Sequence, residues 1–417
     1  MENLDRLNTS INISVIGLGF VGLTTALGFA EKGYSVTGFD IDIKKQNSIR
    51  EGIVPFFEPS LEDMLKNNYN TTFFLAEEIT TSSRDADIIF LCVGTPMQSN
   101  GEADLQYIYS AISSIIDTLK ENCTIVIKST VPPSTTNNLI VPYLRNKGFT
   151  GHIANNPEFL REGYCVEDFM FPDRIVCGVE NGNLYASNLL HQLYAPFNAP
   201  VHITTLNSAE FIKYLSNTML ATMISFSNEM SIIANQIGDI EIGKSFKILH
   251  EDKRLADSGI SSYLYPGAGY GGYCLPKDTV ALYKTAQNRG INLPMLGATI
   301  ATNDNMPYIN IDKIKQACAN KSTSITILGL SFKPHSDDIR DTTSSKIISL
   351  LLEDGYTNIN AYDPIAIDEF KKHYKFDIEY SNSLGDVIVI ATAWPQFKEI
   401  NFKNKKIVDL RYMLDLN

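Results

Sequence analysis

The sequence predicts an α/β protein with two doubly wound domains and a long helix between them. Near the N-terminus, an apolar strand at residues 13–16 precedes a run of glycines, a helix and a second strand at residues 34–39. From about residue 322, short apolar runs again alternate with helical patterns, which favours a smaller parallel sheet. Residues 208–238 contain no proline and no interior glycine, which is typical of one continuous helix.

Length, charge and cysteine content narrow the class of protein. The 417 residues exceed one ordinary core and predict two or three domains, and the formal charge of −12 provides no basic surface for nucleic acid. No apolar run is long enough to span a membrane, and the polar stretch 1–10 lacks the apolar part of a signal peptide. Six scattered cysteines show no metal-binding spacing. We therefore expect a cytoplasmic protein with reduced thiols, no metal and no membrane partner.

Residues 13–40 contain the parts of a dinucleotide-binding unit in the required order. Gly17 permits a tight turn, Gly19 lets a pyrophosphate approach the backbone, and Gly22 lets the helix pack on the strand. The N-terminus of that helix suits phosphate groups. Asp40 follows 23 residues after Gly17 and can bind both ribose hydroxyls, so NAD is expected in preference to NADP. The alternative is a structural βαβ unit whose glycines serve packing alone.

Three further residues are placed to contact such a cofactor. Lys45 could hold the adenosine end, or it could be a solvated helix lysine. Thr95 and Thr130 each follow an apolar strand, and ligands of open α/β sheets bind at the carboxyl ends of strands. Either threonine could instead be an ordinary turn cap.

The long helix carries two polar residues among many apolar ones. Lys213 and Asn217 are four residues apart and therefore lie on one face. Such groups are costly in an apolar setting unless they are paired, so they are candidate site residues; a solvated stripe or a salt bridge is the alternative. The apolar positions are too numerous for one face, which predicts that the helix is buried between domains.

Residues 263–279 place Cys274 between a glycine-rich run and Pro276. An amphipathic pattern follows, with Pro276 suited to the first helical position and Gly290 to the residue just past the end. The cysteine is therefore predicted at a helix N-terminus beside Lys277. Unpaired amides and the positive end of the helix dipole favour a thiolate there. Judged alone, however, a single cysteine is more often structural.

In the C-terminal region, Lys333 and Arg340 follow the strand predicted at residues 325–328. Two cations at the end of a strand would suit a diphosphate, although a solvated loop pair would look the same in sequence.

Ordered motifs along nearly the whole chain resemble the UDP-glucose/GDP-mannose dehydrogenase family. They are GLGFVG, EPSLEDML, VGTP, STVPP, NPEFLREG, AEFIKYLSN, GYGGYCLPKDT, GLSFKP and DIR. The resemblance implies a Rossmann NAD-binding domain at 1–205 and a central helical dimerisation domain at 206–310 that carries the cysteine loop. It also implies a smaller Rossmann-like UDP-sugar-binding domain at 311–417 and a homodimer formed through the long helix.

The resemblance further implies three sets of site residues. The catalytic positions are Cys274, Lys213, Asn217, Asp278, Thr130 and Glu162. The cofactor positions are Gly17, Gly19, Phe20, Val21, Gly22, Asp40, Lys45, Thr95, Thr130, Glu162, Lys277 and Arg340. The substrate positions are Glu158, Phe159, Leu160, Arg161, Glu162, Lys213, Asn217, Arg254, Tyr263, Leu264, Tyr265, Pro266, Gly267, Gly271 and Lys333. Among these, Arg254 would reach the sugar of the neighbouring subunit.

The motifs NPEFLREG and GYGGYCLPKDT are similar to the UDP-glucose branch of the family. This implies an NAD-dependent four-electron oxidation of UDP-glucose to UDP-glucuronate, through a thiohemiacetal and a thioester of Cys274. Two departures keep GDP-mannose and other nucleotide sugars open: YLYPG resembles the GDP-mannose branch, and Met223 stands where many relatives have Lys or Arg. A non-catalytic sensor of NAD or sugar nucleotides is a remote alternative. A two-electron hydroxy-acid dehydrogenase, which needs no cysteine, is another.

Overall fold

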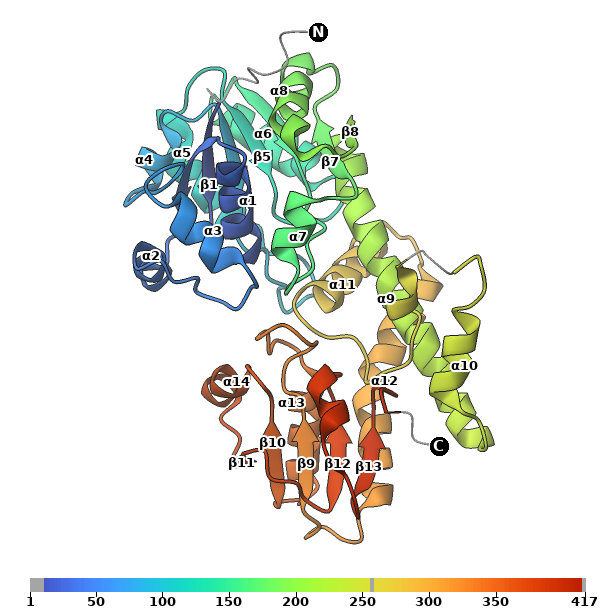
Figure 1. Ribbon diagram of the computed structural model, residues 1–417. Helices are drawn as coiled ribbons and strands as arrows, with labels where there is room; N and C mark the ends of the chain where they lie inside the picture. The colour runs from blue at the N-terminus through green and yellow to red at the C-terminus, as the bar shows by residue number, and fades with distance from the viewer. Residues whose placement is uncertain (1–10, 256–258, 415–417) are drawn as a thin grey trace. The chain divides into compact units, whose positions relative to one another are not determined.

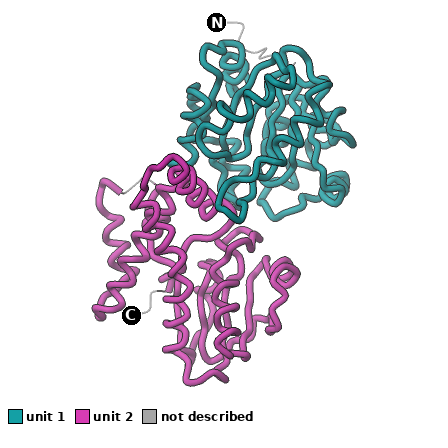
Figure 2. The backbone as a smooth tube through the Cα atoms, turned by 180° about the vertical axis from the view of Figure 1, so that it is seen from behind, with its two compact units in different colours: residues 1–215 teal, residues 216–417 magenta. Residues whose placement is uncertain are grey.

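The chain divides into two compact units, residues 1–215 and residues 216–417 (Figure 2). The structure is a computed structural model that describes residues 11–255 and 259–414. The polar stretch 1–10, which bears on the expectation of no signal peptide, lies outside the described residues. No helix within the described ranges is long and apolar enough to cross a membrane.

Within the described residues, unit 1 is built on an eight-stranded sheet in the order β3-β2-β1-β4-β5-β6-β7-β8 (Figure 1). The strands are β1 (Asn12–Ile16), β2 (Ser35–Phe39), β3 (Phe73–Leu75), β4 (Ile88–Leu91), β5 (Thr124–Ile127), β6 (His152–Asn155), β7 (Ile175–Val179) and β8 (Val201–Thr205). Neighbouring strands are parallel, except that β6 and β7 are antiparallel. Every residue of β4 and β5 is buried, as is typical of parallel strands covered on both faces.

Helices cover both faces of this sheet and enclose two apolar cores. The helices are α1 (Phe20–Glu31), α2 (Ile43–Arg50), α3 (Leu61–Asn68), α4 (Ile79–Ser83), α5 (Gln106–Ile115), α6 (Val141–Asn146), α7 (Cys165–Met170) and α8 (Leu184–Tyr194). A π-helical turn, η2 (Thr136–Ile140), leads into α6. Because side chains alternate along a strand, Val15 and Phe90 pack in one core while Ile16 and Ile89 pack in the other.

The long helix α9 (Leu206–Ile237) has 32 residues, and the boundary between the units falls within it. One stripe of its apolar side chains is exposed: Phe211, Leu215, Met219, Phe226, Met230, Ile233 and Ile237. Spacings of three, four and seven residues place these side chains on one face. The helix was predicted to be buried between domains. In the single chain this is wrong for the exposed stripe, because burial is confined to the opposite face, which carries Tyr214 and Ala221.

Within the described residues, unit 2 contains a five-stranded parallel sheet in the order β11-β10-β9-β12-β13. The strands are β9 (Ile325–Leu328), β10 (Ile359–Tyr362), β11 (Glu379–Tyr380), β12 (Val387–Ile390) and β13 (Lys406–Asp409). The other helices of this unit are α10 (Ile242–Leu249), α11 (Cys274–Gln287), α12 (Pro294–Ala317), α13 (Thr343–Glu353) and α14 (Ile367–Tyr374). This arrangement confirms the predicted α/β class.

The strand predicted at residues 325–328 has these bounds in the structure, and the strand predicted at 13–16 begins one residue earlier. The helix after the glycine-rich run begins at Cys274 itself, so Pro276 is its third residue rather than its first. This shift leaves Cys274 at the first helical position, where the helix N-terminus was predicted.

Candidate functional site

The turn between β1 and α1 has the geometry that a dinucleotide requires. Gly17 has a φ of +90°, and its amide donates to the carbonyl of Phe39 at 2.8 Å. A Cβ on Gly22 would lie 1.7 Å from the carbonyl oxygen of Gly17, so only glycine allows α1 to approach the turn. A Cβ on Gly19 would meet nothing within 4 Å, and no side chain caps α1 at this residue. The backbone here is open to an approaching anion.

Asp40 lies at the end of β2 and is 5% exposed. Its Oδ2 accepts from the amide of Leu18 at 2.7 Å, and its Oδ1 accepts from the amide of Asp42 at 2.9 Å. Lys45 Nζ lies 3.6 Å from Oδ2. A carboxylate offers about four acceptor positions, so each oxygen can accept one more hydrogen bond. These residues fit the ribose end of NAD, with Asp40 pre-oriented by its amide contacts.

Thr95 and Thr130 lie on neighbouring loops at the carboxyl ends of β4 and β5. The hydroxyl of Thr95 donates to the carbonyl of Thr130 at 2.8 Å, and Ser129 Oγ donates to the carbonyl of Val93 at 2.6 Å. The Thr95 hydroxyl therefore joins the two loops. This is a structural role, of the kind that the turn-cap alternative supposed. That contact also fixes where the Thr130 backbone lies.

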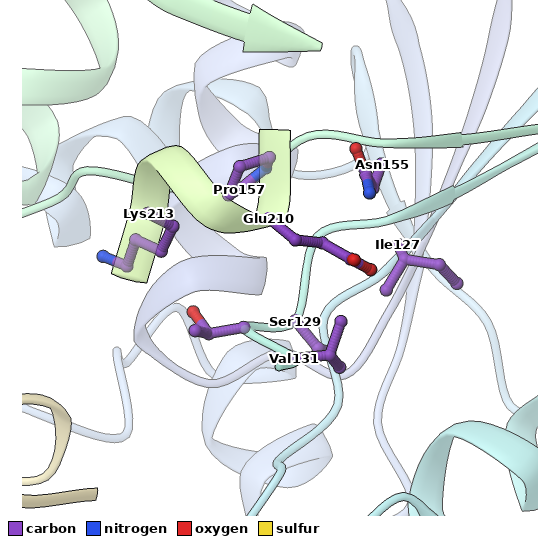
Figure 3. A pocket seen from close by; sticks show the side chains of 8 residues that line it. Ile127, Ser129, Val131, Asn155, Pro157, Glu210 and Lys213 are labelled. Carbon is purple, nitrogen blue, oxygen red and sulfur yellow. The ribbon is translucent and has the colours of Figure 1, made fainter. Parts of the chain in front are cut away.

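A small pocket opens at this edge of unit 1 (Figure 3). Its lining residues come from the ends of β5 and β6, the loops that follow them, and the start of α9: Ile127, Ser129, Thr130, Val131, Asn155, Pro157, Glu210 and Lys213. The carboxyl ends of strands are where open α/β sheets bind ligands, so the pocket lies where a reactant is expected.

A buried ion pair borders the pocket. Lys213 Nζ lies 2.9 Å from Glu158 Oε1, and both side chains are almost fully buried. Burial alone would raise the pKa of Glu158, but the charge and hydrogen bond of Lys213 outweigh it, and the pKa is lowered. Glu158 Oε2 also accepts from the amide of Leu160 at 2.7 Å. Lys213, one of the predicted catalytic residues, thus pairs with a predicted substrate residue, which is the salt-bridge alternative stated above.

The loop of residues 158–162 is anchored at its far end by Glu58, which begins the EPSLEDML motif but was not predicted as a site residue. Glu58 accepts from the amides of Gly163 and Cys165, both at 2.7 Å. Burial raises the pKa of Glu58, although these two hydrogen bonds oppose the shift. Within the loop, Arg161 pairs with Asp168 at 2.6 Å. The predicted substrate loop, which includes Glu162, is therefore held in place by residues that lie outside the loop, Glu58 and Asp168.

In unit 2, Cys274 occupies the first position of α11 and is half-buried. Nearby, the ammonium of Lys277 donates to Asp278 Oδ1, and Asn217 Nδ2 donates to Asp278 Oδ2, both at 2.6 Å. Asp278 is 1% exposed. Burial by itself would lower the pKa of Lys277, but Asp278 and Cys274 raise it, and the net shift is upward. A charged ammonium and a helix N-terminus both favour the thiolate of Cys274.

Tyr273 connects the thiol segment to the predicted cations of unit 2. The Arg340 guanidinium lies 4.3 Å from the centre of the Tyr273 ring, and Lys277 Nζ lies 5.6 Å from it. Arg340 also forms a two-point contact with Asp338, at 2.8 and 2.7 Å. The structure therefore brings Lys277 and Arg340, predicted as cofactor contacts, to one aromatic ring that the sequence did not single out.

Buried asparagines hold the glycine-rich segment before Cys274. Asn228 accepts from the amide of Gly267 at 2.7 Å, and Asn303 both accepts from and donates to the backbone of Tyr270, at 2.7 and 3.0 Å. A Cβ on Gly271 would lie 2.4 Å from the carbonyl oxygen of Asp341. The glycine at position 271 therefore permits close packing against the loop after β9, whatever else it contacts.

The remaining predicted substrate residues of unit 2 have these surroundings. The carbonyl of Leu264 contacts His250 Nε2 at 2.7 Å, and the hydroxyl of Tyr265 donates to the carbonyl of Tyr412 at 2.9 Å. Tyr263 and Pro266 flank these two contacts in the same segment. Lys333 Nζ lies 5.4 Å from the centre of the Phe332 ring. The Arg254 side chain is 88% exposed and pairs with Asp252.

One feature of α9 could have revealed two of the missed residues. Glu210, Lys213, Asn217 and Asn228 are spaced by three, four and eleven residues, and all are buried. These spacings place them along one line of the helix. Only the middle two were predicted as site residues. A buried polar line opposite an apolar stripe is the signal that points to Glu210 and Asn228.

Comparison with known families covers most of the chain. Residues 11–198 match the NAD binding domain of the UDP-glucose/GDP-mannose dehydrogenase family, residues 207–305 match its central domain, and residues 326–416 match its UDP binding domain. The chain belongs to this family, an NAD-dependent oxidoreductase family. The prediction drawn from the ordered motifs is confirmed.

Individual relatives agree with this assignment. The chain is 38% identical over 426 residues to a UDP-glucose 6-dehydrogenase of Rickettsia felis, covering 97% of this chain and 93% of the relative. It is 39% identical over 401 residues to a UDP-glucose 6-dehydrogenase of Bacillus subtilis, covering 93% and 89%. Among solved structures, a UDP-glucose dehydrogenase from Pyrobaculum islandicum is similar with a TM-score of 0.91 and 33% identity, covering 97% and 94%.

Proposed function

We propose that this protein oxidises the C6 alcohol of UDP-glucose to the carboxylate of UDP-glucuronate. One observation carries the proposal: Cys274 begins α11 beside a buried Lys277–Asp278–Asn217 network, in a chain that has the family's NAD binding and UDP binding domains. A two-electron alcohol oxidation needs no such thiol. A four-electron oxidation can use one, because an aldehyde must first become a tetrahedral adduct before a second hydride can leave, and a thiolate can form that adduct.

In this proposal, NAD⁺ is the hydride acceptor in both oxidation steps. Overall, the alcohol, two NAD⁺ and one water are converted to the carboxylate, two NADH and three protons. The Cys274 thiolate adds to the C6 aldehyde and forms a thiohemiacetal. Loss of the second hydride leaves a thioester on Cys274. Water then cleaves the carbon–sulfur bond, which releases the uronate and regenerates the thiolate.

Polar groups of the chain stabilise charge and move protons during these steps. Lys213 and Asn217 are proposed to stabilise the oxyanions of the adducts, since each is a buried donor. Asp278, or Glu162 acting through water, is proposed as the base, and Thr130 is proposed to order water and cofactor. The hydrogen bonds from Lys277 and Asn217 keep the Asp278 carboxylate oriented.

We also infer a homodimer. The exposed apolar stripe of α9, defined above, is a continuous helix face of the kind that a second copy of the same chain can cover. In that assembly, the exposed Arg254 is proposed to reach the sugar of the neighbouring subunit. A cytoplasmic location is part of the same proposal, and the reduced cysteines of the described chain support it.

The assembly is tested by changing the stripe. Phe226→Glu places a charge in the apolar face and should turn a dimer into a monomer in light scattering coupled to size exclusion. Leu184→Glu is the control, because Leu184 is also an exposed apolar residue but lies on α8, outside the stripe. A monomeric wild-type protein at micromolar concentration would contradict the homodimer.

The substrate is tested by initial rates of NADH formation with UDP-glucose, GDP-mannose and UDP-N-acetyl sugars measured side by side. The proposal predicts a clear preference for UDP-glucose and two NADH for each uronate. Preference for GDP-mannose would reassign the substrate within the family. One NADH per substrate would favour a two-electron dehydrogenase, and tight NAD binding without turnover would favour a sensor.

A further inference from the structure

Glu210 lies in the first turns of α9 and is 3% exposed, yet no role in the proposed reaction has been given to it. Its carboxylate does not face Lys213. Figure 3 shows the two side chains leaving the same stretch of α9 in opposite directions along the pocket. The two residues therefore serve different parts of unit 1.

The carboxylate of Glu210 holds two backbone amides at the start of the helix that follows β5. Oε2 accepts from the amide of Ser134 at 2.7 Å, and Oε1 accepts from the amide of Thr136 at 2.8 Å. Ser134 has a φ of +78°, a left-handed conformation that is unfavourable for a residue with a side chain. A charged acceptor with two hydrogen bonds can stabilise this conformation.

These two amides end the loop that carries Thr130. At the other end of this loop, the carbonyl of Thr130 accepts from Thr95. Three residues after Glu210 on α9, Lys213 reaches the loop after β6 through its ion pair with Glu158. The stretch of α9 from Glu210 to Lys213 is thus connected to the loops after β5 and β6, which both line the pocket.

We propose that Glu210 is a positioning residue for the reaction: its carboxylate clamps the Thr130 loop to the part of α9 that carries Lys213. This inference rests on the proposed function, because Thr130 and Lys213 act together only in that reaction. Glu210 contacts neither reactant. Its effect is to keep the Thr130 loop in a fixed position relative to the ammonium of Lys213.

Glu210→Gln tests the clamp with little change in volume. The amide side chain has one acceptor oxygen and one donor nitrogen, so one backbone amide loses its partner and faces a donor instead. We expect kcat for UDP-glucose to fall about 10-fold or more, while KM changes less than about threefold, since misplacement of a reacting group affects the chemical step. Glu210→Asp keeps two acceptor oxygens on a shorter side chain and should recover part of the lost rate.

Asp87→Asn is the matched control. Asp87 also accepts a backbone amide in unit 1, from Asn12 at 2.9 Å, but it lies at the amino ends of the strands, away from the pocket. Thermal melts of all variants show whether each is folded. An equal loss of kcat in Asp87→Asn and Glu210→Gln would overturn the proposal, because general destabilisation would then explain both.

Hydrogen exchange separates this inference from the proposed function. The amides of Ser134 and Thr136 should exchange faster in Glu210→Gln than in the wild-type protein, while those of β5 should not change. If the wild-type protein oxidises no nucleotide sugar, the proposed function fails, and the exchange result still decides whether the clamp exists. Unchanged exchange together with unchanged kcat would overturn the clamp.

Discussion

The sheets of the two units have the same order of strands over five strands, and in both the first strand ends in a turn at a glycine. In unit 1, β1 ends at Gly17, whose φ is +90° and whose amide donates to Phe39 at 2.8 Å. In unit 2, β9 ends at Gly329, whose φ is +98° and whose amide donates to Tyr362 at 2.7 Å. The order β3-β2-β1-β4-β5 in unit 1 corresponds to β11-β10-β9-β12-β13 in unit 2. This turn is therefore a shared device for joining parallel strands.

The acid at the end of the second strand distinguishes the two turns. Asp40 accepts from the amide of Leu18 at 2.7 Å, and Asp363 accepts from the amide of Leu330 at the same distance. The same oxygen of Asp363 also accepts from Trp394 Nε1 at 3.1 Å, and the residue is 1% exposed. The other oxygen of Asp363 accepts hydrogen bonds from the amides of Ile365 and Ala366. Asp363 thus completes a buried network, whereas Asp40 can still accept from a ligand.

The segments after the two turns differ as well. In unit 1, α1 begins at Phe20, three residues after the glycine, so its free amides face the turn. In unit 2, a longer loop precedes α13, which begins at Thr343, and this loop contains Lys333 and Arg340. A helix N-terminus suits the pyrophosphate of a dinucleotide, and paired cations suit a diphosphate. We therefore expect the segment after the turn, rather than the turn itself, to select the ligand.

The largest expected effect tests the division of labour between the units. Cys274→Ala should reduce UDP-glucuronate formation by at least about 10³-fold, since no thiohemiacetal can form, while NAD binding by unit 1 persists. The measurements are product formation by chromatography and NAD affinity by calorimetry. Cys318→Ala is the control, because Cys318 is another half-buried cysteine of unit 2. Normal uronate formation by Cys274→Ala would remove the covalent step.

Lys213→Ala should lower kcat by about 10²-fold, as expected for loss of an oxyanion donor. Stopped-flow and steady-state NADH absorbance give kcat and KM separately. The variant also leaves Glu158 buried without its cation, so Lys213→Ala combined with Glu158→Gln serves as a control for that cost. A change restricted to KM would contradict an oxyanion role and would leave Lys213 as a structural partner of Glu158.

Matched substitutions of the two acids test the comparison directly. Asp363→Ala should lower the free energy of unfolding of unit 2 by about 3 kcal/mol or more, because several buried donors lose their acceptor. Asp40→Ala should instead raise the Kd for NAD by about 10-fold or more and reduce discrimination against NADP. Urea unfolding and calorimetry measure the two quantities. If both variants lost NAD affinity equally, the proposed difference between the turns would be wrong.

A pH dependence of stability is expected in unit 1. Burial raises the pKa of Glu210 from 4.5 to about 7, against the hydrogen bonds from Thr136 and Ser134 that lower it. Since the folded value is the higher one, the stability linked to this group is fully present below pH 4.5 and is lost as the pH rises through about 7. Relative to Glu210→Gln, the wild-type protein should lose stability on the order of 3 kcal/mol across this window.

Urea unfolding of both proteins at several pH values between 4 and 8 measures this difference. A constant difference would show that Glu210 does not titrate in this window. The charged form of Glu210, which is the major form only above about pH 7, offers one acceptor oxygen to each of the two amides, so the proposed clamp should be strongest there.

Local patterns were enough to predict several parts of this molecule. The period of the apolar residues placed the strands and the long helix, and the spacing of Gly17, Gly19 and Gly22 predicted the dinucleotide turn. The glycine-rich run with Pro276 placed Cys274 at a helix N-terminus to within two residues. Such features depend on contacts within a few residues, so they are visible in the order of the amino acids.

The tertiary structure alone decided which distant groups meet. Glu210 lies 74 and 76 residues from the amides that it holds, and Glu58 lies 105 and 107 residues from its own. Lys213 and Asn217 share a helix face but take different partners, Glu158 and Asp278. These pairings follow from the order of strands in the sheets and from the packing of helices on them. Neither the period of the apolar residues nor the spacing of the motifs reveals that order. The helices and strands could therefore be predicted from the amino-acid sequence, whereas the contacts among them were decided by the tertiary structure.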